Sequence, residues 1–255
     1  MAARLELPAT HPHVAVVTID RPEVKNAIDA ATAYEINAAM DALEGDDTLF
    51  LGIITGAGGA FSAGADLKAA ARGEPPARAA RGPFGLCEAP PGKPLIVAVE
   101  GTAFGGGFEI CLACDLIVAA RDAHFALPEV KHNLVALGGG AIRLPRRLPY
   151  HVAMEAALTG VALSAQELQQ YGVVNRVTEP GNALNGALAL ADELLRNGPT
   201  ALAATARIMR ASIAAQEDLL WRTQRDLAAP ALTAEDRAEA LRAFTERRTP
   251  HWTGR

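Results

Sequence analysis

Short apolar runs rich in Val and Ile recur through the first two thirds of the chain, and each one ends in glycine or polar turn residues. Runs of this length are too short for a comfortable helix, so they predict buried strands. The strands predicted in this way are 14–20, 50–55, 94–99, 116–120 and a brief last one at 173–174. Between the first two, Asp29 can cap a helix over 30–43 with Ile36, Ala39, Met40 and Leu43 on its inner face.

The later part of the chain has a helical pattern. Ser164 and Glu167 have the spacing of a capping box for a short helix that stops before Gly172. Beyond Pro180 the pattern predicts no further strand, and it predicts helices over 183–196, 200–215 and 233–245. Alternating strands and helices followed by helices alone predict an α/β body over residues 1–195 and a helical region over 196–255.

The stretch from Lys93 to Glu129 carries the candidate chemistry. Three glycines, 105–107, stand between a predicted strand and residues with helical spacing, so Gly106 or Gly107 should lie in the first turn of a helix. Free amides at a helix start favour negative charge, and glycine lets a ligand approach the backbone, so an oxyanion site is expected here. Glu109 follows one turn later and Glu129 lies 20 residues on. Two carboxyls beside an oxyanion hole can move protons at carbon next to a polarised carbonyl.

Composition limits the function classes. The chain has 255 residues, 50% of them hydrophobic and 21% charged, so it can bury a large core. Its net charge of −5 argues against a general nucleic-acid surface, which needs a concentrated basic face. The start shows no basic segment followed by an apolar one, and no window reaches the length of a membrane span, so we expect a cytoplasmic protein that does not bind membranes.

The three cysteines do not suggest a disulfide framework or a metal centre. Cys111 and Cys114 have a spacing that puts two thiols on one helix, and Cys87 stands apart. No second pair of cysteines or histidines accompanies them. We therefore expect them to pack as small apolar side chains, with no metal bound.

Two other enzyme classes fit the sequence poorly. The segment Ala60-Phe-Ser62-Ala-Gly64 approaches the nucleophile elbow of serine hydrolases, but its first glycine is an alanine and no convincing histidine follows. The glycines at 56 and 58 lack the third glycine of a dinucleotide fingerprint, and no suitable acid follows about 20 residues on.

Several motifs, in order, resemble the crotonase superfamily, the enoyl-CoA hydratases and isomerases. The motifs are Ile19-Asp20-Arg21-Pro22 with Asn26-Ala27, FSAGADL, KPLIVAVEGTAFGGGFE, FALPE, Arg143-Leu144-Pro145 and Ala156 with Leu158-Thr159-Gly160. They cover about four fifths of the chain. The resemblance implies an α/β crotonase (ClpP-like) spiral of ββα units with a C-terminal helical region.

The resemblance also implies roles for individual residues. The backbone amides of Ala65 and Gly106 would hold the oxygen of a thioester, and Glu109 and Glu129 would hold the water. The implied reaction is the reversible addition of water across the 2,3 double bond of an enoyl-CoA, with the coenzyme A thioester as substrate and no permanently bound cofactor. We expect Glu129 to give the α-carbon its proton and Glu109 to orient and activate the water.

Coenzyme A binding and assembly are implied in the same way. The residues expected to line the coenzyme A path are Lys25, Ala27, Ala63, Asp66, Leu67 and Lys68. The family commonly forms trimers or dimers of trimers in which the C-terminal helices reach a neighbour, which would involve Phe244 and Arg247. A homotrimer or hexamer that binds acyl-CoA, but no nucleic acid, is therefore expected.

Alternatives remain open within this family. Ala136 and Leu137 stand where the second glycine turn usually carries a proline and a glycine, so the acyl end of the pocket should be reshaped. The FALPE and GGGFE segments also resemble carnitinyl-CoA dehydratases. An isomerase needs only one base, so Glu109 favours a hydratase. A non-catalytic acyl-CoA binder is disfavoured because both acids are present.

Overall fold

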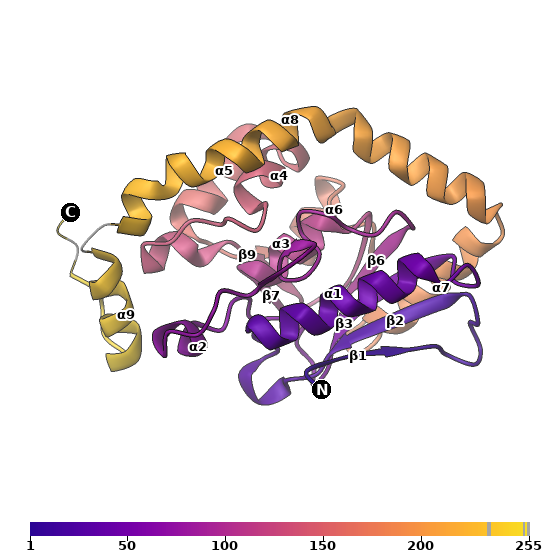
Figure 1. The fold of residues 1–255 in the computed structure, drawn as a ribbon, viewed down its shortest axis with the longest axis horizontal. Helices are drawn as coiled ribbons and strands as arrows, with labels where there is room; N and C mark the ends of the chain where they lie inside the picture. Colours follow the sequence, from indigo (N-terminus) through magenta and orange to yellow (C-terminus); the bar gives the residue numbers. More distant parts are fainter. Residues whose placement is uncertain (234–235, 252, 254–255) are drawn as a thin grey trace.

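The computed structural model describes residues 1–233, 236–251 and 253, without the side chains at 214–216, 225 and 230–232. At its centre is a six-stranded sheet in the order β1, β2, β3, β6, β8 and β11 (Figure 1). These strands are Ala3–Glu6, Val14–Ile19, Leu51–Gly56, Leu95–Val99, Leu116–Ala120 and Arg176–Thr178. Neighbours pair in parallel except β1 and β2, which are antiparallel.

The central strands are apolar without alternation because both faces of the sheet are covered. On one face, Val16, Ile53 and Ile96 pack with helix α7 (Ala183–Leu195). On the other, Val17 and Ile54 belong to the main core, which includes the inner residues of α1 (Ala30–Gly45). Neighbouring residues of one strand therefore supply two separate apolar layers.

Most of the predicted elements are confirmed. The strands expected at 14–20, 50–55, 94–99 and 116–120 lie within one residue of their predicted limits. Asp29 caps α1 by accepting a hydrogen bond from the Thr32 amide, and Ser164 forms the capping box of α6 (Ala165–Gln170) with Glu167. Local capping chemistry therefore fixes these helix starts as the sequence predicts.

One predicted element is wrong and another is too short. Val173 and Val174 do not form a strand, because both of their amides donate to the Leu168 carbonyl and close α6, and the last strand begins at Arg176. The helix predicted over 200–215 extends over Pro199–Thr233 as α8. The sequence pattern also missed β1.

A second, three-stranded sheet places the loops that matter for function. Strand β9 (His124–Ala126) lies between β7 (Thr102–Phe104) and β10 (Leu163–Ser164). Strand β7 leads into α3 (Gly106–Ala113), and β9 leads into the 3-10 helix η2 (Pro128–His132). Because β7 and β9 pair in parallel, the start of α3 and the start of η2 meet at the same end of this sheet.

The remaining elements surround this arrangement, and Figure 1 shows α8 arching over it toward α9. They are η1 (Pro22–Val24), α2 (Leu67–Ala71), β4 (Arg78–Ala79), β5 (Gly82–Pro83), α4 (Gly140–Arg147), α5 (Tyr150–Thr159) and α9 (Asp236–Glu246).

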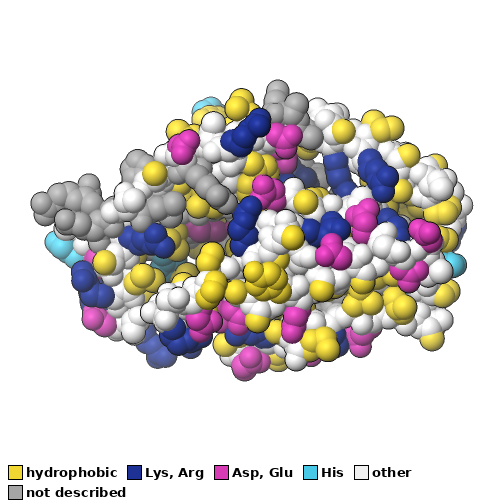
Figure 2. Space-filling model, in the orientation of Figure 1, with side chains coloured by type: hydrophobic (Ala, Val, Ile, Leu, Met, Phe, Trp, Pro, Cys, Tyr) yellow, Lys and Arg dark blue, Asp and Glu magenta, His cyan; other side chains and the backbone are white. Residues whose placement is uncertain are grey.

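Arg210 of α8 donates a hydrogen bond to Asp115, which also accepts one from the Leu95 amide. On the face in Figure 2, basic and acidic side chains are interspersed.

Asn26 holds together the turns that lead to the glycine-rich loops. Its side chain is fully buried, accepts a hydrogen bond from the Arg21 amide and donates to the carbonyls of Ala57 and Ala60, each at 2.8 Å. Its φ of 55° lies in the left-handed region that asparagine tolerates better than most residues.

Replacing Asn26 by leucine should therefore lower the free energy of unfolding by about 3 kcal/mol, because three hydrogen bonds are lost and buried polar groups remain unpaired. Urea denaturation measures this change. Asn185 is exposed, and Asn185→Leu should change stability by less than about 0.5 kcal/mol. Equal effects of the two substitutions would contradict the role of Asn26.

Candidate active site

The loop that follows β3 lies directly against β7. The Phe104 amide donates to the Ser62 carbonyl and the Ser62 amide donates to the Thr102 carbonyl, both at 2.9 Å. A bridge joins Ser62 to Ala103 in the same direction. The loop therefore runs beside β7 and brings Ala65 to the region where α3 begins.

Glycine makes this approach possible. A methyl group on Gly64 would lie 2.7 Å from the Gly106 nitrogen, and one on Gly107 would lie 2.5 Å from the Ser62 carbonyl oxygen. Gly64 also has a φ of 86°, which side chains disfavour. Among the described residues, the amides of Ala65 and Gly106 have no hydrogen-bond acceptor. Two unused amides thus lie on neighbouring loops.

Glu109 is buried in the first turn of α3, with 2% of its surface exposed. Its Oε1 accepts a hydrogen bond of 2.8 Å from the Gly140 amide. The turn before α4 fits closely around the carboxyl, because a methyl group on Gly138 would lie 2.5 Å from Oε2. The turn formed by the glycines at 138–140 therefore encloses the carboxyl of Glu109.

Glu129 stands at the start of η2, next to the glycine triplet. Its Oε1 would lie 3.3 Å from a methyl group on Gly105, which places the carboxyl beside the start of α3. Its Oε2 is buried and has no hydrogen-bond partner in the described part of the chain. Glu129 is thus a half-buried residue whose carboxyl has one buried, uncommitted oxygen.

The two carboxyls alter each other's ionisation. Burial, followed by the charge of Glu129, raises the pKa of Glu109 to about 8, although the amides of Gly140 and Gly138 and the charge of Arg143 oppose this rise. Burial also raises the pKa of Glu129, to about 7. The two acids titrate as a pair, so the pair retains a proton near neutral pH. Such a pair can both donate and accept a proton.

Arg143 is a feature of this site that sequence reasoning did not assign. The guanidinium is buried, donates to Glu217 at 3.2 Å and lies 5.7 Å from the ring centroid of Trp221. Its Nη1 is buried without a hydrogen-bond partner among the described residues. Its position depends on α8, which contributes Glu217 and Trp221 from more than 70 residues away along the chain, so no local pattern could have indicated it.

The residues predicted to line a coenzyme A path gather at one turn. The Ala63 amide donates to the Lys25 carbonyl at 2.9 Å, and a bridge joins Ile28 to Ala65. Ala27 is buried, Leu67 is half-buried and the side chains of Lys25 and Lys68 are exposed. The six residues thus come from two distant segments that meet beside Ala65.

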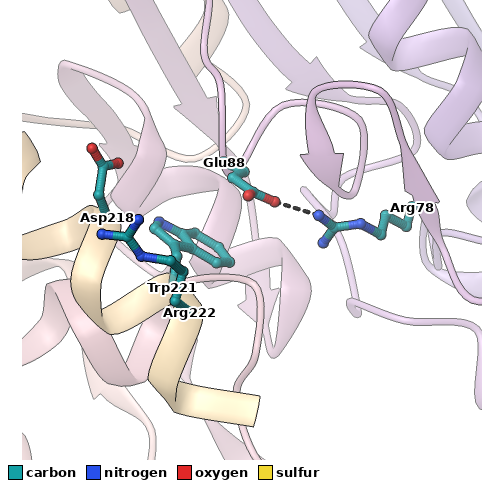
Figure 3. A pocket seen from close by; sticks show the side chains of 5 residues that line it. All are labelled: Arg78, Glu88, Asp218, Trp221 and Arg222. Carbon is teal, nitrogen blue, oxygen red and sulfur yellow. Dashed lines mark hydrogen bonds and ion pairs between the residues drawn. The ribbon is translucent and has the colours of Figure 1, made fainter.

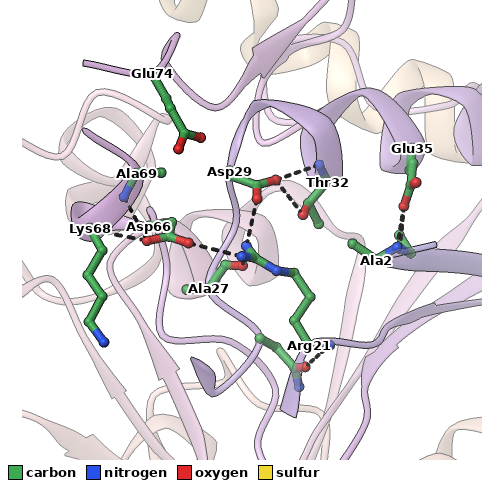
Figure 4. Close-up of polar contacts among 12 residues, drawn as sticks. Ala2, Arg21, Ala27, Asp29, Thr32, Glu35, Asp66, Lys68, Ala69 and Glu74 are labelled. Atoms are coloured by element: carbon green, nitrogen blue, oxygen red, sulfur yellow. Dashed lines mark hydrogen bonds and ion pairs between the residues drawn. The ribbon is translucent and has the colours of Figure 1, made fainter. Parts of the chain in front are cut away.

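Asp66 has a structural role in this surface. Its carboxylate accepts from the amides of Lys68 and Ala69 at the start of α2, and it pairs with Arg21 at 3.1 Å (Figure 4). Arg21 also contacts Asp29 and donates to the Ala27 carbonyl. Arg21 therefore joins the caps of α1 and α2, a role that the sequence did not indicate.

Phe244 and Arg247 lie on and just after α9, away from that turn along the chain. The ring of Phe244 meets His132 of η2 edge-on, with centroids 5.7 Å apart. Both residues line a cavity of about 330 Å³ together with Lys131 and Arg248. Within one chain, they therefore flank the 3-10 helix that carries Glu129.

The other candidate residues have structural positions. The Ser62 hydroxyl is buried and donates to the Asn26 carbonyl, so it serves the loop. All three cysteines are free and buried.

Over the residues described, no group of His, Cys, Asp and Glu side chains has the arrangement of a metal site. None of the described helices combines the length and apolar character of a membrane span.

The family model for enoyl-CoA hydratase/isomerase matches residues 9–255. The chain belongs to this family. The family acts on coenzyme A thioesters. A carnitinyl-CoA dehydratase of Salmonella paratyphi B is 43% identical over 248 residues, which are 94% of each chain.

Solved structures of this family have the same fold. An enoyl-CoA hydratase from Mycobacterium tuberculosis is 48% identical with a TM-score of 0.80, and a carnitinyl-CoA hydratase from Mycobacterium avium is 38% identical with a TM-score of 0.92. Each match covers 100% of this chain and 99% of the other. The predicted crotonase-type α/β fold is therefore confirmed.

The raised pKa of Glu109 predicts a pH-dependent stability. The folded protein retains a proton that the unfolded chain releases near pH 4.5, so stability falls as the pH rises toward about 8 and is level above it. Glu109→Gln removes the contribution of Glu109 to this dependence and leaves that of Glu129. Between about pH 5 and about pH 9, wild type should lose on the order of 4 kcal/mol of unfolding free energy through Glu109, at about 1.4 kcal/mol for each pH unit, and the variant should not lose this contribution.

Urea denaturation of both proteins across this range measures the difference. Glu155 is exposed, and Glu155→Gln serves as the control with an unchanged pH profile. Parallel profiles for wild type and Glu109→Gln would mean that Glu109 is not held protonated by the fold.

Proposed function

We propose that this protein is an enoyl-CoA hydratase that adds water reversibly across the 2,3 double bond of an enoyl-CoA. The observation that carries the proposal is the pairing of two carboxyls of raised pKa, on the buried Glu109 and the half-buried Glu129, beside the uncommitted amides of Ala65 and Gly106. A mere acyl-CoA binder would not need two carboxyls that are costly to bury.

The amides provide the electrostatic part of the reaction. A thioester oxygen bound between Ala65 and Gly106 would gain negative charge in the transition state, and this polarisation makes the β-carbon electrophilic. The start of α3 adds the positive end of its helix dipole at Gly106. Donors in such a hole typically contribute about 10²–10³-fold each to the rate.

The carboxyls provide the protons. Glu109 accepts a proton from water as the oxygen bonds to the β-carbon, and Glu129 gives its proton to the α-carbon. Glu109 has the higher pKa of the coupled pair, so the single proton that the pair retains must move to Glu129 before water attacks. In that form the hydrogen bond from Gly140 stabilises the carboxylate of Glu109. The product gains one water in total, and the pair has exchanged which member is protonated.

The binding surface and the assembly extend this proposal. Lys25 and Lys68 offer exposed cations for the phosphates of coenzyme A, while Ala27, Ala63, Asp66 and Leu67 shape the path. We further propose a homotrimer or hexamer in which the region from residue 196 onward, with Phe244 and Arg247, meets a neighbouring subunit. A solution mass of a single chain would contradict this assembly.

Carnitinyl-CoA dehydration is a second candidate. The relatives with that printed name support it. A cavity of about 500 Å³ is lined by Arg78, Glu88, Asp218, Trp221 and Arg222 (Figure 3). Its lining has as many cations as anions and Glu88 is paired with Arg78, so its charge does not by itself favour a quaternary ammonium group. Comparing the rates with crotonyl-CoA and carnitinyl-CoA separates the two candidates.

Removing either acid should abolish hydration. Glu129→Gln and Glu109→Gln are each expected to lower kcat for crotonyl-CoA by at least about 10²-fold, since general acid and base catalysis contributes about 10²–10⁴-fold. Loss of the conjugated enoyl absorbance follows the reaction. The control Glu155→Gln should retain wild-type kcat.

The same variants separate the hydratase from an isomerase. Glu109→Ala should abolish hydration yet spare the movement of a double bond from the 3,4 to the 2,3 position, which needs only one base. Intact hydration in Glu109→Ala would overturn the two-acid assignment.

A further inference from the structure

The aromatic ring of Phe84 packs against the two glycines that shape the site. A methyl group on Gly106 would lie 2.3 Å from Cζ of Phe84, and one on Gly138 would lie 2.8 Å from Cε2. The methyl position on Gly138 is also 2.5 Å from Oε2 of Glu109. The tip of the ring is therefore next to both the Gly106 backbone and the Glu109 carboxyl.

Phe84 reaches this place through an unfavourable backbone conformation. Its φ is 55°, and it stands between Gly82 with a φ of 93° and Gly85 with a φ of 80°. A bulky residue in the left-handed region is an outlier that the surrounding structure must hold, and such residues cluster at functional sites.

Contacts with α1 and the preceding loop hold this segment. The Phe84 amide donates to the Ala77 carbonyl at 2.8 Å. Gly85 lies so close to α1 that a methyl group on it would be 2.2 Å from the Ala33 carbonyl oxygen. Arg81 donates to Asp41 of α1. The backbone of Phe84 is thus fixed to a rigid helix, and its ring is held at the site.

A cavity of mixed charge lies near the same segments. Glu88 and Arg78, which are paired, face Trp221 of α8 across it (Figure 3). Trp221 in turn lies 3.1 Å from the methyl position on Gly139. Phe84 does not line this cavity, so the space beside Gly106 and Glu109 is occupied by the ring itself.

We infer that Phe84 determines acyl specificity: its ring fills the space beside Gly106 and Glu109 and restricts the enzyme to short acyl groups, and a longer chain enters the space that the ring leaves when it is removed. This inference rests on the proposed acyl-CoA function.

The consequence for chain length can be estimated. Each methylene that moves from water into an apolar environment gains about fourfold in affinity. A chain that extends a few methylenes past the position of the ring should therefore gain at least about tenfold when Phe84 is replaced by alanine, whereas a four-carbon acyl group should gain nothing.

The test measures kcat/KM for enoyl-CoA substrates of four, six, eight and ten carbons in wild type, Phe84→Ala and Phe84→Leu. In Phe84→Ala, the ratio of the ten-carbon to the four-carbon value should rise at least about tenfold, with Phe84→Leu between it and wild type. An unchanged ratio in both variants would overturn the inference.

Two further measurements keep the result specific. Phe50 stacks on His13 at a centroid distance of 4.3 Å, and Phe50→Ala, which also loses an aromatic ring, should leave the ratio unchanged. Thermal unfolding shows whether Phe84→Ala is folded, and Phe84→Leu carries the test if it is not. A ratio that shifts equally in Phe50→Ala would contradict a local role for Phe84.

Binding separates this inference from the proposed reaction. Calorimetric titration with saturated butyryl-CoA and decanoyl-CoA needs no turnover. If wild type hydrates no substrate but Phe84→Ala still gains affinity for decanoyl-CoA relative to butyryl-CoA, the role of Phe84 is supported and the hydratase proposal fails. If hydration occurs but Phe84→Ala changes neither the ratio of kcat/KM values nor the ratio of affinities, the hydratase proposal is supported and the role of Phe84 is contradicted.

Discussion

The close contact between the loop at Gly64 and the start of α3 is the constraint on which the rest of the site depends. The two backbones approach so closely that a methyl group on Gly64 would lie 2.6 Å from the Phe104 carbonyl oxygen and 2.7 Å from the Gly106 nitrogen. Hydrogen bonds between Ser62 and β7 hold the loops in this position. Glycine permits this approach of the two backbones, so the amides of Ala65 and Gly106 lie on neighbouring loops.

Burial of the acids is a second requirement of the site, and it depends on a different set of segments. Glu109 is enclosed by the turn before α4, and Glu129 is carried by η2 after β9. Desolvation is the largest cause of the raised pKa of each carboxyl. A fold that merely brought two acids together at its surface would leave both ionised near neutral pH, because water would stabilise their charges. Because glycine turns enclose the carboxyls, the pair can hold a proton near neutral pH and can also release it.

The sequence predicted those features that depend on local patterns. The parallel strands, the capped helices and the glycine triplet at the start of α3 could be read from short segments, and the motifs named the family. Val173 and Val174 were misassigned because an apolar pair can also close a helix. The positions of Phe84, Arg143 and Arg21 could not be predicted, because each depends on partners that lie more than 20 residues away in the chain. The roles of the two acids stay a prediction from the family and from chemistry.

Helix α8 contacts the rest of the molecule about a third and about two thirds of the way along its length. Arg210 bonds to Asp115 at the edge of the main sheet, and Trp221 packs on the turn that encloses Glu109. Eleven helical residues separate them, a rise of about 16 Å. The helix thus fixes both the distance between the two contacts and their relative rotation about the helix axis. A single inserted residue between the two contacts would rotate the indole by about 100° away from the turn, so this interval should tolerate substitutions far more readily than changes in length.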